Sequence, residues 1–181
     1  MIDDLTKRFT DSWEHWGGTW ELWENPVAAR LALLHYLREA NRRELLAWQA
    51  KEMPVPGLQE AMADAGITLL HPHRRNLSPD VVMGLTSADA ALAASGSLVL
   101  APAPGRSWLP ALIPIRHVVL MPTSRIYANL GAWRQDWLRT RPQDAQRALI
   151  ISGPSVSDDI ELHKHYGMFG PRYIHLLLFH E

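Results

Sequence analysis

Two short stretches combine hydroxyl groups with an acid at the same spacing. Thr86 to Asp89 reads TSAD, and Ser155 to Asp158 reads SVSD. In such a pattern the hydroxyl caps a helix start and the acid reaches back to it. Each pattern follows a short apolar segment, so we expect both helices to begin at strand ends. Free N–H groups and the helix dipole bind small anions there. Caps of purely structural use remain the alternative.

The acid of the second pattern belongs to a cluster of three: Asp158, Asp159 and Glu161. Acids in a first helical turn stabilise the helix through its dipole. The functional interpretation is a general base or a metal carboxylate. On the expected helix, Asp159 points away from the capping face, and it is therefore the single candidate acid or base.

Arg106 and Ser107 follow a Pro-Gly turn at Pro104 and Gly105. A guanidinium held by such a turn matches the geometry of a carboxylate or a phosphate. The alternative is an arginine of a solvated loop, and the sequence does not decide between the two.

The histidines do not form a recognisable metal site. His71 and His73 lack a nearby carboxylate or third histidine, and the His163–His165 spacing is wrong for chelation from one helix. His175 alternates with apolar residues and is predicted to be a core histidine. No P-loop, GxGxxG, GxSxG or HExxH pattern occurs, which disfavours the common nucleotide-binding and hydrolase functions.

Helical and extended patterns alternate along the chain and must position these groups. Asn25-Pro26 is typical of a helix start, and that helix is expected to reach about Arg43. Strands are expected at 45–48, 67–70, 97–100 and 117–121, with apolar runs at 149–151 and 173–179. Helices are expected at 57–65, at 88–95 and after Asn129. This alternation predicts an α/β fold with a largely parallel sheet.

Residues 1–24 carry apolar and tryptophan side chains at helical spacing, interrupted at Gly17-Gly18. We expect a Trp-rich helical extension here, followed by one α/β domain over 25–181. The stripe either packs on its own domain or forms a partner or homo-oligomer surface, because tryptophan is enriched in interface hot spots.

The composition narrows the class of protein. A chain of 181 residues with a net charge of −1 predicts one domain and no nucleic-acid partner. There is no cysteine, so this chain cannot hold a Cys-ligated iron–sulfur cluster. No signal-peptide pattern or membrane-length apolar run occurs, and the predicted compartment is the cytoplasm.

Several motifs in one order resemble the LUD domain, a lactate-utilisation family. They lie at 86–100, 105–107, 109–110, 117–118, 153–161, 167–171 and 174–175. The resemblance implies a three-layer α/β/α fold of the phosphosugar-isomerase and CoA-transferase type. It also implies a part in oxidising L-lactate to pyruvate beside iron–sulfur and flavin partners, with no cofactor on this chain.

Two positions depart from the family pattern. Ala94 stands where the family often has Glu, and Phe169 replaces a His. Both changes suit a non-catalytic member, so the sequence leaves open whether the chain is an enzyme.

Three hypotheses follow. The first is a component or accessory of lactate or 2-hydroxyacid oxidation, with a crevice for a small anion. The second is a stand-alone enzyme acting on a phosphorylated or CoA-linked metabolite, and the third is a non-catalytic interaction module. The predicted ligand-binding residues are Thr86, Asp89, Ser95, Gly96, Ser97, Arg106, Ser107, Gly153, Ser155, Ser157 and Glu161.

Overall fold

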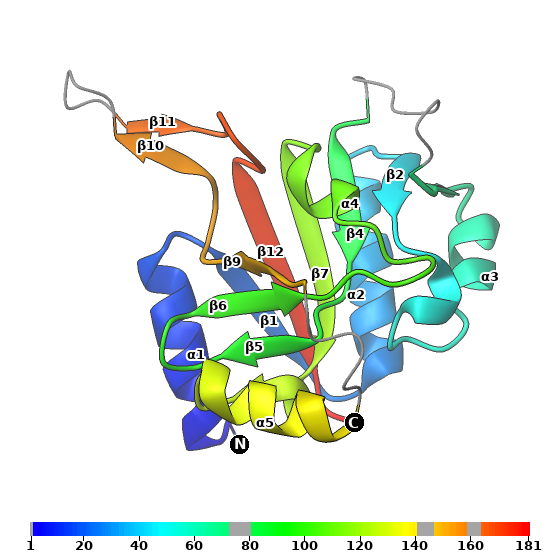
Figure 1. The fold of residues 1–181 in the computed structure, drawn as a ribbon. Helices are drawn as coiled ribbons and strands as arrows, with labels where there is room; N and C mark the ends of the chain where they lie inside the picture. Colours follow the sequence, from blue (N-terminus) through cyan, green and yellow to red (C-terminus); the bar gives the residue numbers. More distant parts are fainter. Residues whose placement is uncertain (1, 73–80, 141–146, 159–163) are drawn as a thin grey trace.

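A computed structural model describes residues 2–72, 81–140, 147–158 and 164–181. Its centre is a six-stranded sheet in which all strands run parallel, in the order β1-β12-β7-β4-β2-β3 (Figure 1). The strands are β1 (Thr19–Trp23), β2 (Glu44–Ala47), β3 (Thr68–Leu70), β4 (Met83–Thr86), β7 (Arg116–Pro122) and β12 (Tyr173–Phe179). The predicted α/β fold with a parallel sheet and flanking helices is thus confirmed.

Helices flank this sheet and the smaller sheet described below. They are α1 (Asp4–His15), α2 (Pro26–Glu39), α3 (Leu58–Asp64), α4 (Leu109–Leu112) and α5 (Leu130–Thr140), with short 3-10 turns η1 (Ala50–Glu52) and η2 (Thr123–Arg125). Asn25 caps α2 by accepting from the Ala28 N–H at 2.9 Å, as its sequence pattern predicts. In Figure 1, α2 lies behind the sheet and α4 in front of it.

A second sheet lies in front of the first. It has the order β8-β5-β6-β9, from β8 (Ile126–Tyr127), β5 (Ala90–Leu92), β6 (Ser97–Leu100) and β9 (Leu149–Ile151). Because strand side chains alternate, Ala91 and Leu98 join the main core, while Val99 packs in a separate cluster with Trp133 and Trp137 of α5. The small sheet therefore lies between the main core and α5.

The chain then leaves the body as an arm. Strands β10 (Val156–Asp158) and β11 (Lys164–Tyr166) form an antiparallel pair that projects from the molecule in Figure 1. We refer to this hairpin with Gly167–Gly170, which follows it, as the arm.

Two predicted helix starts are wrong. The 88–95 segment forms β5 and a turn toward β6, and the last three residues of SVSD form β10. The Asp89 carboxylate does not cap a helix, because it accepts from the Ala101 N–H at 2.7 Å. Alanine favours a helix by only fractions of a kcal/mol per residue, so strand pairing and burial of Ala90–Ala93 override it.

The N-terminal prediction is half right. Residues 4–15 are helical, but 19–23 form edge strand β1, which pairs with β12 along its whole length. The bend follows Gly17, which has φ of +85°. Trp13 is completely buried in the main core, whereas Trp16 is half exposed. Most side chains of the stripe therefore belong to the main core or pack against it.

Candidate functional site

Four parallel strands end at the same edge of the main sheet, and each is followed by a charged residue. Lys51 comes after β2, Asp89 after β4, Arg125 after β7 and Glu181 after β12. In open α/β sheets, ligands bind outside the carboxyl ends of the strands. This carboxyl edge is therefore the first place to seek a site.

A cavity of about 490 Å³ opens at this edge. Residues from the β2–α3 connection, the two sheets and α5 line it: Lys51, Glu52, Met53, Pro54, Asp89, Arg106, Arg125, Tyr127, Asp136, Trp137 and Thr140. We call it the polar cavity. Its lining includes two of the predicted ligand-binding residues, Asp89 and Arg106.

Arg106 is the most enclosed cation of this cavity. Its Nη2 donates to Asp89 Oδ2, and the two side chains are only 9% and 5% exposed. The guanidinium carbon lies 4.5 Å from the centre of the Trp48 ring. Arg106 Nε is buried and has no hydrogen-bond partner among the described residues. Arg106 is therefore not an arginine of a solvated loop. Its side chain is enclosed by Asp89 and Trp48, and its Nε has no partner among the described residues.

The fixed position of Arg106 depends on its neighbours. Trp48 Nε1 donates to the Ser107 carbonyl at 2.7 Å, and Ser107 Oγ accepts from the Leu109 N–H at 3.2 Å. Ser107 therefore stabilises the loop, and it is absent from the residues lining the polar cavity.

The other charges of the polar cavity are partly compensated. Tyr127 donates from its hydroxyl to Asp136 Oδ2 at 2.8 Å, and Asp136 also pairs with Arg139. Burial, helped by this bond, raises the pKa of Tyr127. Hydrogen bonds from Arg139 and Tyr127 lower the pKa of Asp136.

Two cations border the cavity without belonging to these pairs. Arg125 Nη1 donates to the Ala88 carbonyl at 2.9 Å and to Ser87 Oγ at 3.3 Å. Lys51 is exposed and has no ion pair with any described residue. Lys51, and the part of the Arg106 guanidinium that lines the cavity, are therefore the cations that an acidic ligand would meet.

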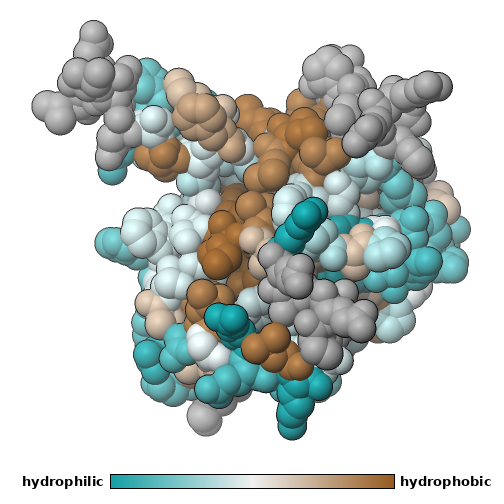
Figure 2. Space-filling view, in the orientation of Figure 1, coloured by the Kyte–Doolittle hydropathy of each residue, from teal (hydrophilic) through white to brown (hydrophobic). Residues whose placement is uncertain are grey.

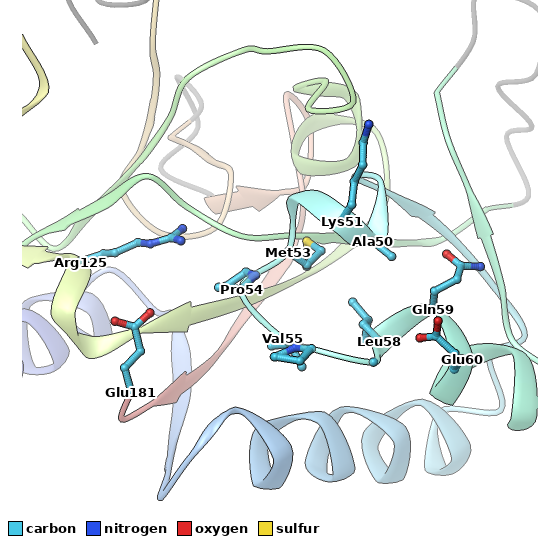
Figure 3. A pocket seen from close by; sticks show the side chains of 12 residues that line it. Ala50, Lys51, Met53, Pro54, Val55, Leu58, Gln59, Glu60, Arg125 and Glu181 are labelled. Atoms are coloured by element: carbon cyan, nitrogen blue, oxygen red, sulfur yellow. The ribbon is translucent and has the colours of Figure 1, made fainter. Parts of the chain in front are cut away.

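A second cavity, of about 540 Å³, adjoins the first (Figure 3). Lys51, Met53, Pro54 and Arg125 line both. Its further wall is mainly the proline-rich stretch 54–58 with Glu60 and Glu181. The combined space is far larger than a molecule of six heavy atoms, such as lactate, needs.

Another group of predicted residues forms a separate hydroxyl cluster. Ser97 Oγ lies 2.8 Å from Ser95 Oγ and 2.7 Å from Ser152 Oγ. The nearby glycines serve packing, because a Cβ on Gly96 would lie 2.6 Å from the Ser12 carbonyl carbon and one on Gly153 would lie 2.6 Å from Trp16 Cβ. Both also have positive φ. These glycines let α1 approach the small sheet closely.

The remaining predicted residues lie apart from both groups. Thr86 is buried, with Oγ1 2.8 Å from His117 Nε2. Ser155 lies at the base of the arm, where its hydroxyl accepts from the Phe169 N–H at 3.1 Å, and Ser157 lies on β10. Asp159 and Glu161 lie outside the described residues. The predicted ligand-binding residues that the structure describes therefore do not come together in the single crevice expected from the sequence.

The histidine predictions are resolved where the structure describes them. His175 Nδ1 lies 2.8 Å from Thr19 Oγ1, and its ring stacks on Tyr36 at 5.2 Å, as suits a core histidine. His71 Nδ1 lies 3.2 Å from the Ala47 carbonyl. His73 and His163 lie outside the described residues. Within the described ranges, no three His, Asp or Glu residues are grouped to hold a metal.

Sequence reasoning missed Lys51, Arg125, Tyr127 and Asp136. The first two follow predicted strands by a few residues, so a search at strand ends would have found them. Tyr127 and Asp136 carry no such signal, because the small sheet and the docking of α5 bring them to the cavity.

Comparison with known proteins places this fold. Residues 23–179 match the LUD domain family. The chain is 34% identical over 111 residues to a lactate utilization protein C of Exiguobacterium sp., covering 59% of this chain and 48% of that protein. It is 26% identical over 147 residues to a protein of the same name from Halalkalibacterium halodurans, covering 77% and 64%. The chain thus spans about half to two thirds of these relatives.

A solved structure is similar over nearly the whole chain. It is a DUF162 family protein from Deinococcus radiodurans, with a TM-score of 0.67 and 14% identity, and 99% of each chain is covered. At this identity the likeness supports the fold alone. Among the described residues, no helix is long and apolar enough to cross a membrane.

Proposed function

The chain belongs to the LUD domain family, and from this membership we propose that it works in the utilisation of lactate or a related 2-hydroxyacid. In this proposal it is a component or accessory of the oxidation to pyruvate. It binds the acid, or its 2-oxo product, in the polar cavity at the carboxyl edge.

One observation carries the proposal of a binding site. Arg106 is nine-tenths buried at the wall of the polar cavity, positioned by Asp89 and Trp48, with a buried donor that no described residue uses. Lys51 adds an exposed cation to the lining of the cavity. A carboxylate between these two cations would gain charge-assisted hydrogen bonds from the groups that face the cavity.

The chemistry of oxidation belongs to partners in this proposal. The chain has no cysteine to hold an iron–sulfur cluster, so iron–sulfur or flavin subunits would remove the electrons. The names of the relatives support a lactate-utilisation context. The contribution of this chain would be to hold the small acid.

Growth on L-lactate as the only carbon source tests the proposal. A deletion strain should fail to grow, and the wild-type gene should restore growth. A gene carrying Lys51→Ala should restore it poorly, whereas Lys7→Ala, a change of an exposed lysine on α1, should restore it fully. Normal growth of the deletion strain on lactate would remove the proposed role.

A larger anion is the second candidate, and the size of the two adjoining cavities favours it. A phosphorylated or CoA-linked metabolite would place its charge near Lys51 and Arg125, which border both cavities. A ligand at 100 times its Kd adds about 2.7 kcal/mol, which raises the melting temperature by roughly 5–10 °C for a chain of this size. A metabolite panel that produces no shift would exclude this candidate.

A further inference from the structure

Large apolar side chains are exposed on the arm and on the part of the body beside it. On the arm they are Val156, Tyr166, Met168 and Phe169, and Phe169 is 79% exposed. Figure 2 shows hydrophobic surface gathered between the arm and the region of α4 and continuing down the front of the molecule. A contiguous exposed apolar patch on a folded protein usually marks an interaction surface.

The body beside the arm presents the second half of this surface. Ile113, Ile115 and Tyr173 are each nearly half exposed. Ile115 and Tyr173 are neighbours, because the Tyr173 N–H donates to the Ile115 carbonyl at 3.1 Å, and Ile113 precedes Ile115 by two residues; we call the three the apolar strip. Arg116 and Arg172 lie over the Tyr173 ring at 4.6 and 5.5 Å. Tyrosine and arginine are the residue types that dominate interface hot spots.

The arm needs support that its own pairing does not supply. It is a two-stranded sheet, and an isolated hairpin is marginally stable in water. At its base the two chain segments that carry it are bonded to each other, where the Ser155 N–H donates to the Pro171 carbonyl at 2.8 Å. The β10 and β11 strands pair only with each other in the described chain, so each keeps an unpaired edge.

We propose that this surface binds a second copy of the same chain in a two-fold symmetric dimer. The apolar arm of each copy would cover the Ile113–Ile115–Tyr173 strip of the other. One chain carries both the projecting arm and the apolar strip, so a two-fold axis satisfies both at once.

The exposed area is of the size that a stable dimer needs. A large side chain offers about 200 Å² when fully exposed, so the seven side chains leave on the order of 700 Å² of surface per copy. A standard protein interface buries about 800 Å² per partner. The arm and strip together match this value.

The dimer surface and the polar cavity lie at opposite ends of the main sheet. Tyr173 begins β12 and Ile115 precedes β7, whereas the cavity lies beyond the carboxyl ends of the parallel strands. Dimer formation therefore leaves the cavity open, and this proposal is independent of the proposed function.

Light scattering during gel filtration measures the mass in solution. The wild-type chain should elute at twice its 20.5 kDa, and the double variant Tyr166→Ser, Phe169→Ser should elute at 20.5 kDa. Leu31→Ser is the matched control: this residue of α2 is 59% exposed but lies away from the patch, and its variant should stay dimeric.

Circular dichroism should show the same secondary structure for all three proteins. If the double variant loses its fold, the single change Phe169→Ser decides, because that side chain is the most exposed of the set. A wild-type monomer at every concentration, or a variant that remains dimeric, would overturn the proposal.

Discussion

Two buried polar pairs dominate the molecule at the scale of single residues. Asp89 and Arg106 pair at the wall of the polar cavity, and Thr86 and His117 pair inside the main sheet. Burying a charge without its partner is strongly unfavourable, whereas a well-bonded pair is close to neutral. The residue types of both pairs are visible in the sequence. Their pairing is not, since 17 and 31 positions separate the partners.

Breaking one partner of the Asp89–Arg106 pair should destabilise the fold more than removing both. Arg106→Gln leaves the Asp89 carboxylate buried without its cation, which costs about 3–5 kcal/mol. The double variant Arg106→Gln, Asp89→Asn should recover part of this loss. Urea unfolding of the two single variants and the double variant measures the coupling; simple additivity of the losses would contradict the pairing.

His117 should make the fold sensitive to mild acid. Its complete burial lowers its pKa from the ordinary 6.5 to about 3. The unfolded chain therefore takes up a proton below about pH 6.5 that the folded chain refuses. Protonation of His117 therefore costs no stability above pH 6.5. As the pH falls from 6.5 toward 3, the free energy of unfolding decreases by up to about 1.4 kcal/mol per pH unit.

The variant His117→Gln isolates this effect. Its free energy of unfolding should be lower at pH 7.5, but it should fall less steeply between pH 6.5 and 4.5 than that of the wild type. Urea unfolding at several pH values gives both slopes. Equal slopes would show that His117 does not carry the pH dependence.

At the scale of elements, the sequence predicts what local patterns determine. The cap at Asn25, the parallel strands and the apolar runs at 149–151 and 173–179 all appear in the structure. The helix prediction for 88–95 is wrong because the structure of this segment depends on β8 and α5, which contact it only in the folded chain. Short alanine-rich segments have weak preferences, and burial on both faces decides them.

The packing of α4 on β4 gives an element-scale prediction. A Cβ on Gly84 would lie 1.8 Å from the Pro110 carbonyl oxygen, so Gly84→Ala must displace the backbone of α4. Overpacking of this kind costs about 1–3 kcal/mol or more, equivalent to a fall in melting temperature of roughly 2–10 °C.

Gly131→Ala in α5 is the control for this change, since its added Cβ would meet only the Asn129 side chain, at 3.2 Å. It should alter the melting temperature by no more than a few degrees. Differential scanning calorimetry compares the two variants with the wild type. A Gly84→Ala protein as stable as the wild type would show that α4 does not press on β4 as described.

At the scale of the whole molecule, we propose that one surface binds the ligand and another forms the dimer. The carboxyl edge of the main sheet holds the polar cavity, and the opposite end holds the arm and its apolar strip. The order of the strands creates the cavity. Lys51, Asp89 and Arg125 are far apart in sequence, but they follow the neighbouring strands β2, β4 and β7. The family resemblance predicts the fold, but the polar cavity can be located only when the order of the strands is known.

In the proposed function, the carboxyl edge binds a small 2-hydroxyacid through Lys51 and Arg106. Titration of the isotopically labelled protein with L-lactate, followed by ¹H–¹⁵N NMR, tests it most directly. We expect saturable shifts of the amide signals of residues 50–53 and of Arg106. Lys51→Ala should weaken binding about tenfold or more, as expected for a lost charged hydrogen bond. Absence of saturable shifts at this edge, or undiminished binding by Lys51→Ala, would show that the acid does not bind here in the proposed way.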